Sequence, residues 1–118
     1  MSAATTSSEY QPKKTVYTLE YLLNLDSEAI SDLDRDRLAE TPPVELAHYI
    51  DRLDLDHRRE ILRMVSDEIA TDILAEMDVE SSAEVFEHMQ EPRAARILEE
   101  LDPDDATDVF AELEVRKR

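Results

Sequence analysis

The chain has 118 residues, of which 30 are Asp or Glu and 13 are Lys or Arg, so its formal net charge is −17. It contains no cysteine and no glycine, which excludes disulfides, thiolate zinc sites, cysteine nucleophiles and the glycine-dependent loops that bind nucleotide phosphates. A surface this acidic repels phosphate backbones, so we expect cations or basic protein surfaces as partners and no nucleic acid.

The length of the chain is typical of one small domain. Residues 1–16 are rich in Ser and Thr and lack the apolar core of a secretory signal, so they are interpreted as a disordered tail. No apolar run approaches the ~20 residues that a membrane-spanning helix needs. We therefore expect a cytoplasmic protein without direct membrane insertion.

Helical patterns begin after this tail. Thr18 precedes three leucines with the spacing of one helical face, and a second segment starts at Ser27 and ends before Pro42-Pro43. We expect residues 17–41 to form one or two N-terminal helices that cover the open end of the structure that follows.

From Pro42 to Leu113 the sequence divides into six consecutive blocks of twelve residues. The blocks are PPVELAHYIDRL, DLDHRREILRMV, SDEIATDILAEM, DVESSAEVFEHM, QEPRAARILEEL and DPDDATDVFAEL. The eighth, ninth and twelfth residues of every block are apolar. These residues are Tyr49, Ile50, Leu53, Ile61, Leu62, Val65, Ile73, Leu74, Met77, Val85, Phe86, Met89, Ile97, Leu98, Leu101, Val109, Phe110 and Leu113.

The fifth residue of each block is usually small or apolar as well, and Arg58 is the exception. Positions five, eight, nine and twelve have the spacing of one helical face. Because twelve steps of about 100° leave a drift of about 120°, one continuous helix would turn successive stripes in different directions. Each block must therefore form its own short helix, which predicts an all-α, armadillo-like superhelical solenoid of short antiparallel helices over 42–115, followed by a basic tail at 116–118.

The residues that open the blocks support this division. Four of them are good helix N-caps, namely Asp54, Ser66, Asp78 and Asp102. Pro92 and Pro103 suit a first helical turn, where a missing N–H costs nothing. Without glycine the helices cannot end on a left-handed residue of that type, which favours linkers of three or four residues.

No arrangement of a nucleophile with a base is present, so we do not expect an enzyme. His48, His57 and His88 lie off the apolar stripe and are interpreted as solvated surface residues.

Negative charge is concentrated in the second half of the chain. Residues 66–115 hold 17 acidic side chains against Arg93 and Arg96, a net charge of −15. The densest cluster runs from Glu99 to Asp105, and Asp108 follows one turn after Asp104, where two like charges repel. A hard divalent cation such as Mg²⁺ would offset this repulsion. Two simpler interpretations stay open: an ordinary acid-rich helix start, and adaptation of the whole surface to high salt.

The six blocks resemble the intracellular N-terminal domain of the MgtE family of magnesium channels and transporters. The blocks that carry this resemblance are PPVELAHYIDRL, SDEIATDILAEM, QEPRAARILEEL and DPDDATDVFAEL. The resemblance covers residues 18–113. It implies a superhelical domain that precedes two CBS domains and a transmembrane region, at the cytoplasmic face of the membrane, with a homodimer formed through the parent transporter. Mg²⁺ at the acidic interface with the CBS domains would favour the closed channel. The resemblance implies Mg²⁺-binding carboxylates at Asp104 and Asp108, with Asp105 adjacent.

Two departures from the family accompany this resemblance. The chain has no CBS domains and no transmembrane segment, so we expect an excised sensor domain or a free-standing relative that does not itself conduct ions. Family members also often open the first block with His-Pro, where this chain has Pro42-Pro43.

The alternative is a protein-interaction scaffold similar to the flagellar motor switch protein FliG. The middle domain of that protein carries a Glu-His-Pro-Gln signature where this chain has Glu40-Thr41-Pro42-Pro43, and Glu45 fits the magnesium family better.

Overall fold

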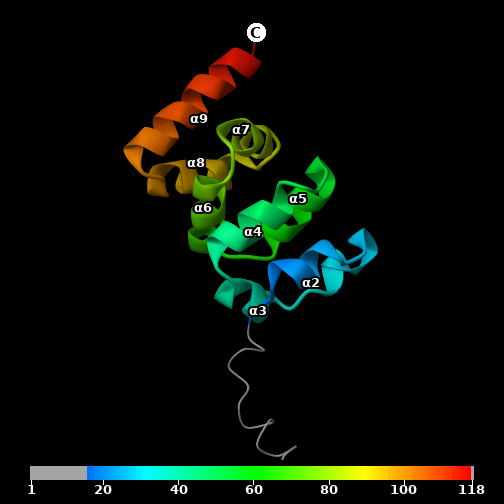
Figure 1. The fold of residues 1–118 in the computed structure, drawn as a ribbon. Coiled ribbons are helices and arrows are strands. Elements are labelled where there is room, and N and C mark those ends of the chain that lie inside the picture. Colours follow the sequence, from blue (N-terminus) through cyan, green and yellow to red (C-terminus); the bar gives the residue numbers. More distant parts are fainter. Residues whose placement is uncertain (1–15, 118) are drawn as a thin grey trace, which may run out of the picture.

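The computed structural model describes residues 16–117, so the predicted N-terminal tail lies outside the described residues apart from Val16. Within this range every regular element is helical and no strand is present. The helices rise from α2 and α3 at one end to α9 at the other, in a body of 65 × 28 × 21 Å (Figure 1). The elements are α2 (Leu19–Leu23), the 3₁₀ helix η2 (Ser27–Asp32), α3 (Arg35–Glu40), α4 (Pro43–Ile50), α5 (Leu55–Arg63), α6 (Asp67–Glu76), α7 (Val79–Glu87), α8 (Glu91–Glu100) and α9 (Pro103–Arg116).

The N-terminal segment forms three short helices where one or two were expected. Thr18 caps α2 as predicted, since its hydroxyl oxygen accepts a hydrogen bond from the Tyr21 N–H at 3.1 Å. The second predicted segment is divided because the Asp34 carboxylate accepts the N–H groups of Asp36 and Arg37 and so starts a new helix. The sequence analysis overlooked this internal cap.

The six repeat blocks form six helices, α4 to α9, and their starts follow the predicted chemistry in part. Asp54 and Ser66 accept hydrogen bonds from N–H groups in the first turns of α5 and α6. Asp78 and Asp102 stand at the N-cap positions of α7 and α9 but make no side-chain hydrogen bond there. The linkers are two to four residues long, slightly shorter than expected.

Alternate helices make the principal contacts. α4, α6 and α8 pack in succession on one side of the stack, and η2, α5, α7 and α9 pack in succession on the other, while α2 lies against α4. Because each block repeats the same apolar stripe, every second helix presents its stripe to an equivalent neighbour. This arrangement confirms the predicted all-α solenoid.

The stripe residues form most of the core. Thirteen of the eighteen are buried, and four more, Leu53, Met89, Leu98 and Leu113, are partly buried against the core. Phe110 differs, with 54% of its surface exposed. It lies on α9, the last helix of the stack (Figure 1), where no further helix of the described chain follows to cover its side chain.

The helices end without any residue in the left-handed conformation, since no residue of the described range has a positive φ. Some of their last carbonyl groups instead accept hydrogen bonds from side chains. Arg58 donates from Nε to the carbonyl of Ile50, the last residue of α4, at 3.2 Å and to the carbonyl of Leu53 in the following linker at 2.9 Å. Ser82 donates from its hydroxyl to the Leu74 carbonyl in the last turn of α6, at 2.8 Å. Side chains of the next helices therefore stabilise ends that glycine often terminates in other proteins.

Candidate metal site

The three predicted metal-binding carboxylates lie in the first two turns of α9. Asp102 is the N-cap, Pro103 is the first helical residue, and Asp104 and Asp105 follow in the first turn. Carboxylates at this end are stabilised by the positive end of the helix dipole. Asp108 stands four residues after Asp104 and three after Asp105, so both are its neighbours on the helix surface.

Two of the three carboxylates line the same depression. Asp105 and Asp108 border a small cavity of about 40 Å³ that α9 forms with the end of α6 and the start of α7. Its other walls include Leu74, Val79 and the buried Ser82. Asp104 is exposed and does not line this cavity. The tertiary fold therefore brings Asp105 and Asp108 to one face together and leaves Asp104 beside them.

The negative charge of these carboxylates is not balanced locally. Among the described residues, none of Asp104, Asp105 and Asp108 forms an ion pair. Within residues 16–117, an ion pair ties α9 to another helix only at the opposite end, where Arg116 Nε lies 3.0 Å from Glu87 Oε1. That hydrogen bond raises the pKa of Arg116 above its ordinary value. The start of α9 thus carries three carboxylates whose charge no ion pair of the described residues balances.

The described chain does not assemble a complete set of metal ligands. No group of three or more His, Cys, Asp or Glu side chains in residues 16–117 is close enough to hold a metal ion. Mg²⁺ often binds proteins through one or two carboxylates and keeps several waters. Asp105 and Asp108 fit such a partial site, in which water or another polypeptide supplies the remaining oxygens.

Two carboxyl groups that bind side chains or backbone within the fold have lowered pKa values. Asp54 accepts the His57 N–H at the start of α5, and this hydrogen bond lowers its pKa. Asp67 receives hydrogen bonds from Arg96 and Arg93, which lower its pKa. In the core, burial raises the pKa of the Tyr49 hydroxyl, to which Glu60 also contributes.

The histidines follow the sequence analysis. His48 and His88 are exposed, and the partly exposed ring of His57 lies 2.9 Å from the Asp54 carboxylate on the same helix.

The side chains that the sequence analysis missed are arginines. Arg58 reaches the end of α4, as described above, and Arg59, Arg63, Arg93 and Arg96 line one cavity between α5 and α8. Two signals pointed to them. Arg58 is the exception at the fifth position of the repeat, and Arg93 and Arg96 are the two basic residues of the acidic segment 66–115.

In residues 16–117 no helix has the length and apolarity required to cross a bilayer. Residues 41–118 match the family described as the MgtE intracellular N domain. Searches of curated proteins and of solved structures returned no match. The matched region starts at Thr41, one residue before the first twelve-residue block, and it covers all six blocks.

Proposed function

Because the chain belongs to the family of the MgtE intracellular N domain, we propose that it is the cytoplasmic magnesium-sensing domain of a magnesium transporter. The family match confirms the resemblance seen in the sequence and favours it over the flagellar switch protein. In this proposal the domain binds Mg²⁺ through Asp105 and Asp108, with Asp104 adjacent, and shares the ion with a CBS domain of the transporter.

The observation that carries the proposal is the unpaired carboxylate pair at the start of α9. Asp105 and Asp108 border one depression, and no basic side chain of the described range pairs with either of them. Like charges held this close raise the free energy of the empty site, and a bound divalent cation turns the repulsion into attraction. Such a site responds to the cation concentration without needing a complete protein cage.

The same charges explain how binding could control a transporter. An acidic partner domain is repelled by the second half of this chain, whose net charge is −15. Mg²⁺ ions between the two surfaces replace this repulsion with attraction and favour the docked state. A coupling free energy of about 1–3 kcal/mol is typical of such regulation and is enough to shift a two-state equilibrium by a factor of about 5 to 150.

Exposed apolar surface near the acidic site supports a docking role. Phe110 borders a depression of about 530 Å³ together with Ala94 and Leu98 of α8. Glu91 and Glu99 line the same depression and add polar groups to it. An apolar patch with a polar rim is typical of a protein–protein contact.

The proposal is tested by NMR with Mg²⁺ and with Mn²⁺, a paramagnetic ion that also prefers oxygen ligands. We expect Mn²⁺ to broaden the amide signals of residues 104–109 first, and excess Mg²⁺ to restore them. The variant Asp105→Asn/Asp108→Asn should lose this localised broadening. A single Asp104→Asn variant should weaken it less, because Asp104 does not line the depression.

The matched control is Asp56→Asn/Glu60→Gln, which removes two charges with i, i+4 spacing from α5 and should leave the broadening of α9 unchanged. The proposal fails if Mn²⁺ broadens acidic residues evenly along the chain. It also fails if Mg²⁺ and potassium chloride of equal ionic strength produce the same shifts in α9.

A further inference from the structure

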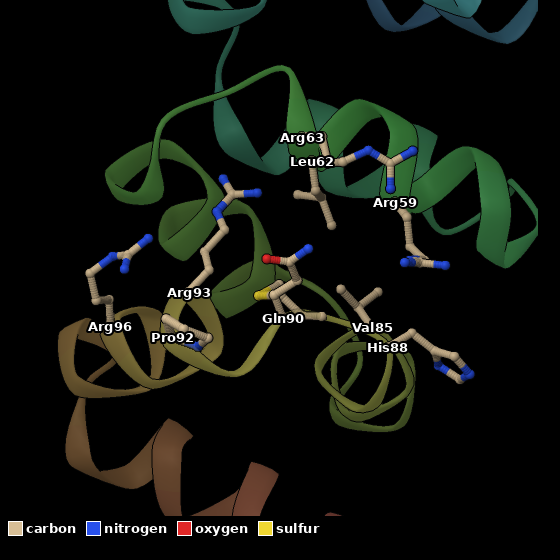
Figure 2. A pocket seen from close by; sticks show the side chains of 10 residues that line it. Arg59, Leu62, Arg63, Val85, His88, Gln90, Pro92, Arg93 and Arg96 are labelled. Atoms are coloured by element: carbon tan, nitrogen blue, oxygen red, sulfur yellow. The ribbon is translucent and has the colours of Figure 1, made fainter.

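Four of the ten arginines of this acidic chain gather around one cavity. The cavity has a volume of about 340 Å³ and lies between α5, the end of α7 and the start of α8 (Figure 2). Arg59 and Arg63 come from α5, and Arg93 and Arg96 come from α8. This group is defined here as the arginine cavity.

The guanidinium groups of Arg59 and Arg63 have no hydrogen-bond or ion-pair partner among the described residues. They are four residues apart on α5, so they lie on one face of the helix, and neither forms an ion pair within residues 16–117. Two adjacent guanidinium groups repel each other, and a bound anion relieves that repulsion. The neighbouring Arg58, by contrast, is engaged with backbone carbonyls and Glu84.

Arg93 and Arg96 are held in place by a single carboxylate. Asp67 Oδ1 accepts from Arg93 Nε at 2.8 Å, and its Oδ2 accepts from Arg96 Nε at 2.7 Å. Arg93 also donates a terminal nitrogen to the Val65 carbonyl at 2.9 Å. One negative charge thus positions two positive ones, so the cavity keeps an excess of positive charge.

The start of α8 adds the positive end of a helix dipole, although Glu91 places one carboxylate in its first turn and Pro92 has no N–H to donate. Gln90 is the N-cap of this ten-residue helix, and its side chain makes no capping hydrogen bond. Figure 2 shows Gln90 between Arg93 and Arg96 on one side and Arg59 and Arg63 on the other. The positive end of the helix dipole therefore faces the same space as the guanidinium groups.

The cavity also has an apolar wall, formed in part by Leu62, Val85 and Pro92. Its volume lies within the range of about 300–1,000 Å³ that is common for small-molecule sites. Guanidinium groups bind both carboxylates and phosphates, but a carboxylate offers two oxygens in one plane. A phosphate offers three oxygens in different directions, which suits donors that approach from two helices.

We propose that the arginine cavity binds a phosphorylated small molecule, with the phosphate among the guanidinium groups and the organic part against the apolar wall. The net charge of −17 does not prevent this binding. At a physiological ionic strength the Debye length is about 8 Å, so more distant carboxylates are largely screened and the nearest arginines dominate.

The test uses the whole chain and three probes in NMR titrations at constant ionic strength: inorganic phosphate, hexyl phosphate and heptanoate. We expect both phosphates to shift the amides of residues 59–63, 90, 91 and 93–96. Hexyl phosphate should bind more tightly than inorganic phosphate because of the apolar wall, and heptanoate should bind more weakly than hexyl phosphate. If inorganic phosphate binds as tightly as hexyl phosphate, the organic part of the proposal is wrong and free phosphate is the ligand.

The decisive variant is Arg59→Gln/Arg63→Gln. Loss of two charge-assisted contacts should weaken the binding of hexyl phosphate by about tenfold or more. The control Arg35→Gln/Arg52→Gln makes the same change of charge at two exposed arginines outside the cavity and should change the affinity less than twofold. Equal losses in the two variants, or heptanoate binding as tight as that of hexyl phosphate, would overturn the proposal.

Discussion

At the scale of single residues, arginine and serine replace glycine at helix ends. Arg58 and Ser82 both occupy the fifth position of a block, two blocks apart, and each donates to carbonyls at the end of an earlier helix. A third nitrogen contact links Arg58 to the Asp51 carbonyl at 3.1 Å. Unpaired carbonyls in the half-buried linkers would be costly, and these side chains remove that cost.

We therefore predict that Arg58→Ala lowers the free energy of unfolding by about 3 kcal/mol, because several hydrogen bonds from one charged, mostly buried group are lost. Chemical denaturation followed by circular dichroism measures this change. The control Arg52→Ala removes the same charge from an exposed position and should change the stability by less than about 0.5 kcal/mol. Similar losses in both variants would mean that the charge of Arg58, and not its contacts, stabilises the fold.

At the scale of helices, the Asp67 carboxylate links α6 to α8, which are neighbours on the same side of the stack. It belongs to α6, and both of its arginine partners belong to α8. The ion pair between Asp67 and Arg93 is less exposed to solvent than the one with Arg96, since 19% of the Arg93 side chain is exposed, against 58% for Arg96. These hydrogen bonds lower the pKa of Asp67 below its ordinary value.

Because the pKa of Asp67 is lowered in the folded state, the stability of the protein should depend on pH. The stabilisation from Asp67 is fully present above the unfolded-state pKa, about 3.9, and is lost as the pH falls through the lower folded-state pKa. Asp67→Asn should therefore be less stable than the parent chain at pH 7, and the difference should shrink below about pH 4. Denaturation of both proteins between pH 7 and pH 3 measures this.

Asp72→Asn is the control for this experiment, because Asp72 is exposed on the same helix and forms no ion pair in the described range. The stability of Asp72→Asn should be closer to that of the parent chain than the stability of Asp67→Asn is. A difference between Asp67→Asn and the parent chain that stays constant with pH would contradict the assignment.

At the scale of the whole molecule, the uneven charge is the main electrostatic feature. Residues 66–115 carry a net charge of −15 and form α6 to α9, which pack together in the stack. Dense charge of one sign opposes the compact state through self-repulsion. Salt shortens the range of this repulsion, from a Debye length of about 30 Å at 0.01 M to about 3 Å at 1 M.

We predict that potassium chloride raises the melting temperature between about 0.01 M and 1 M, by several degrees, because for a chain of this size 1 kcal/mol corresponds to roughly 4 °C. Scanning calorimetry measures the shift. The variant Glu99→Gln/Glu100→Gln removes two charges from the densest acidic cluster and should show a smaller salt effect. A melting temperature that falls with salt would show that attractive ion pairs outweigh the repulsion.

The helices were predictable to different degrees. The twelve-residue repeat placed α4 to α9 within a few residues, because apolar spacing and helix starts are local signals. The N-terminal helices were less clear, since their division at Asp34 depends on one side-chain cap. The repeat also predicted burial of Phe110, which is exposed because burial of a stripe residue requires a neighbouring helix.

The candidate metal site was likewise only partly predictable from the sequence. Spacing along one helix was enough to suggest that Asp104, Asp105 and Asp108 are neighbours. It could not show that Asp105 and Asp108 face the end of α6 and the start of α7 while Asp104 lies outside that depression. These three carboxylates remain a proposed site for Mg²⁺.

The helical class, the number of repeat helices, the family and the concentration of acidic residues are all encoded in short-range patterns. The convergence of Arg59 and Arg63 with Arg93 and Arg96 is different, because about 30 residues of chain separate the two pairs. They meet in one cavity because consecutive short helices reverse the chain and the repeat units stack. Local patterns define the units of this protein, and the stacking of the units determines which charged side chains face one another.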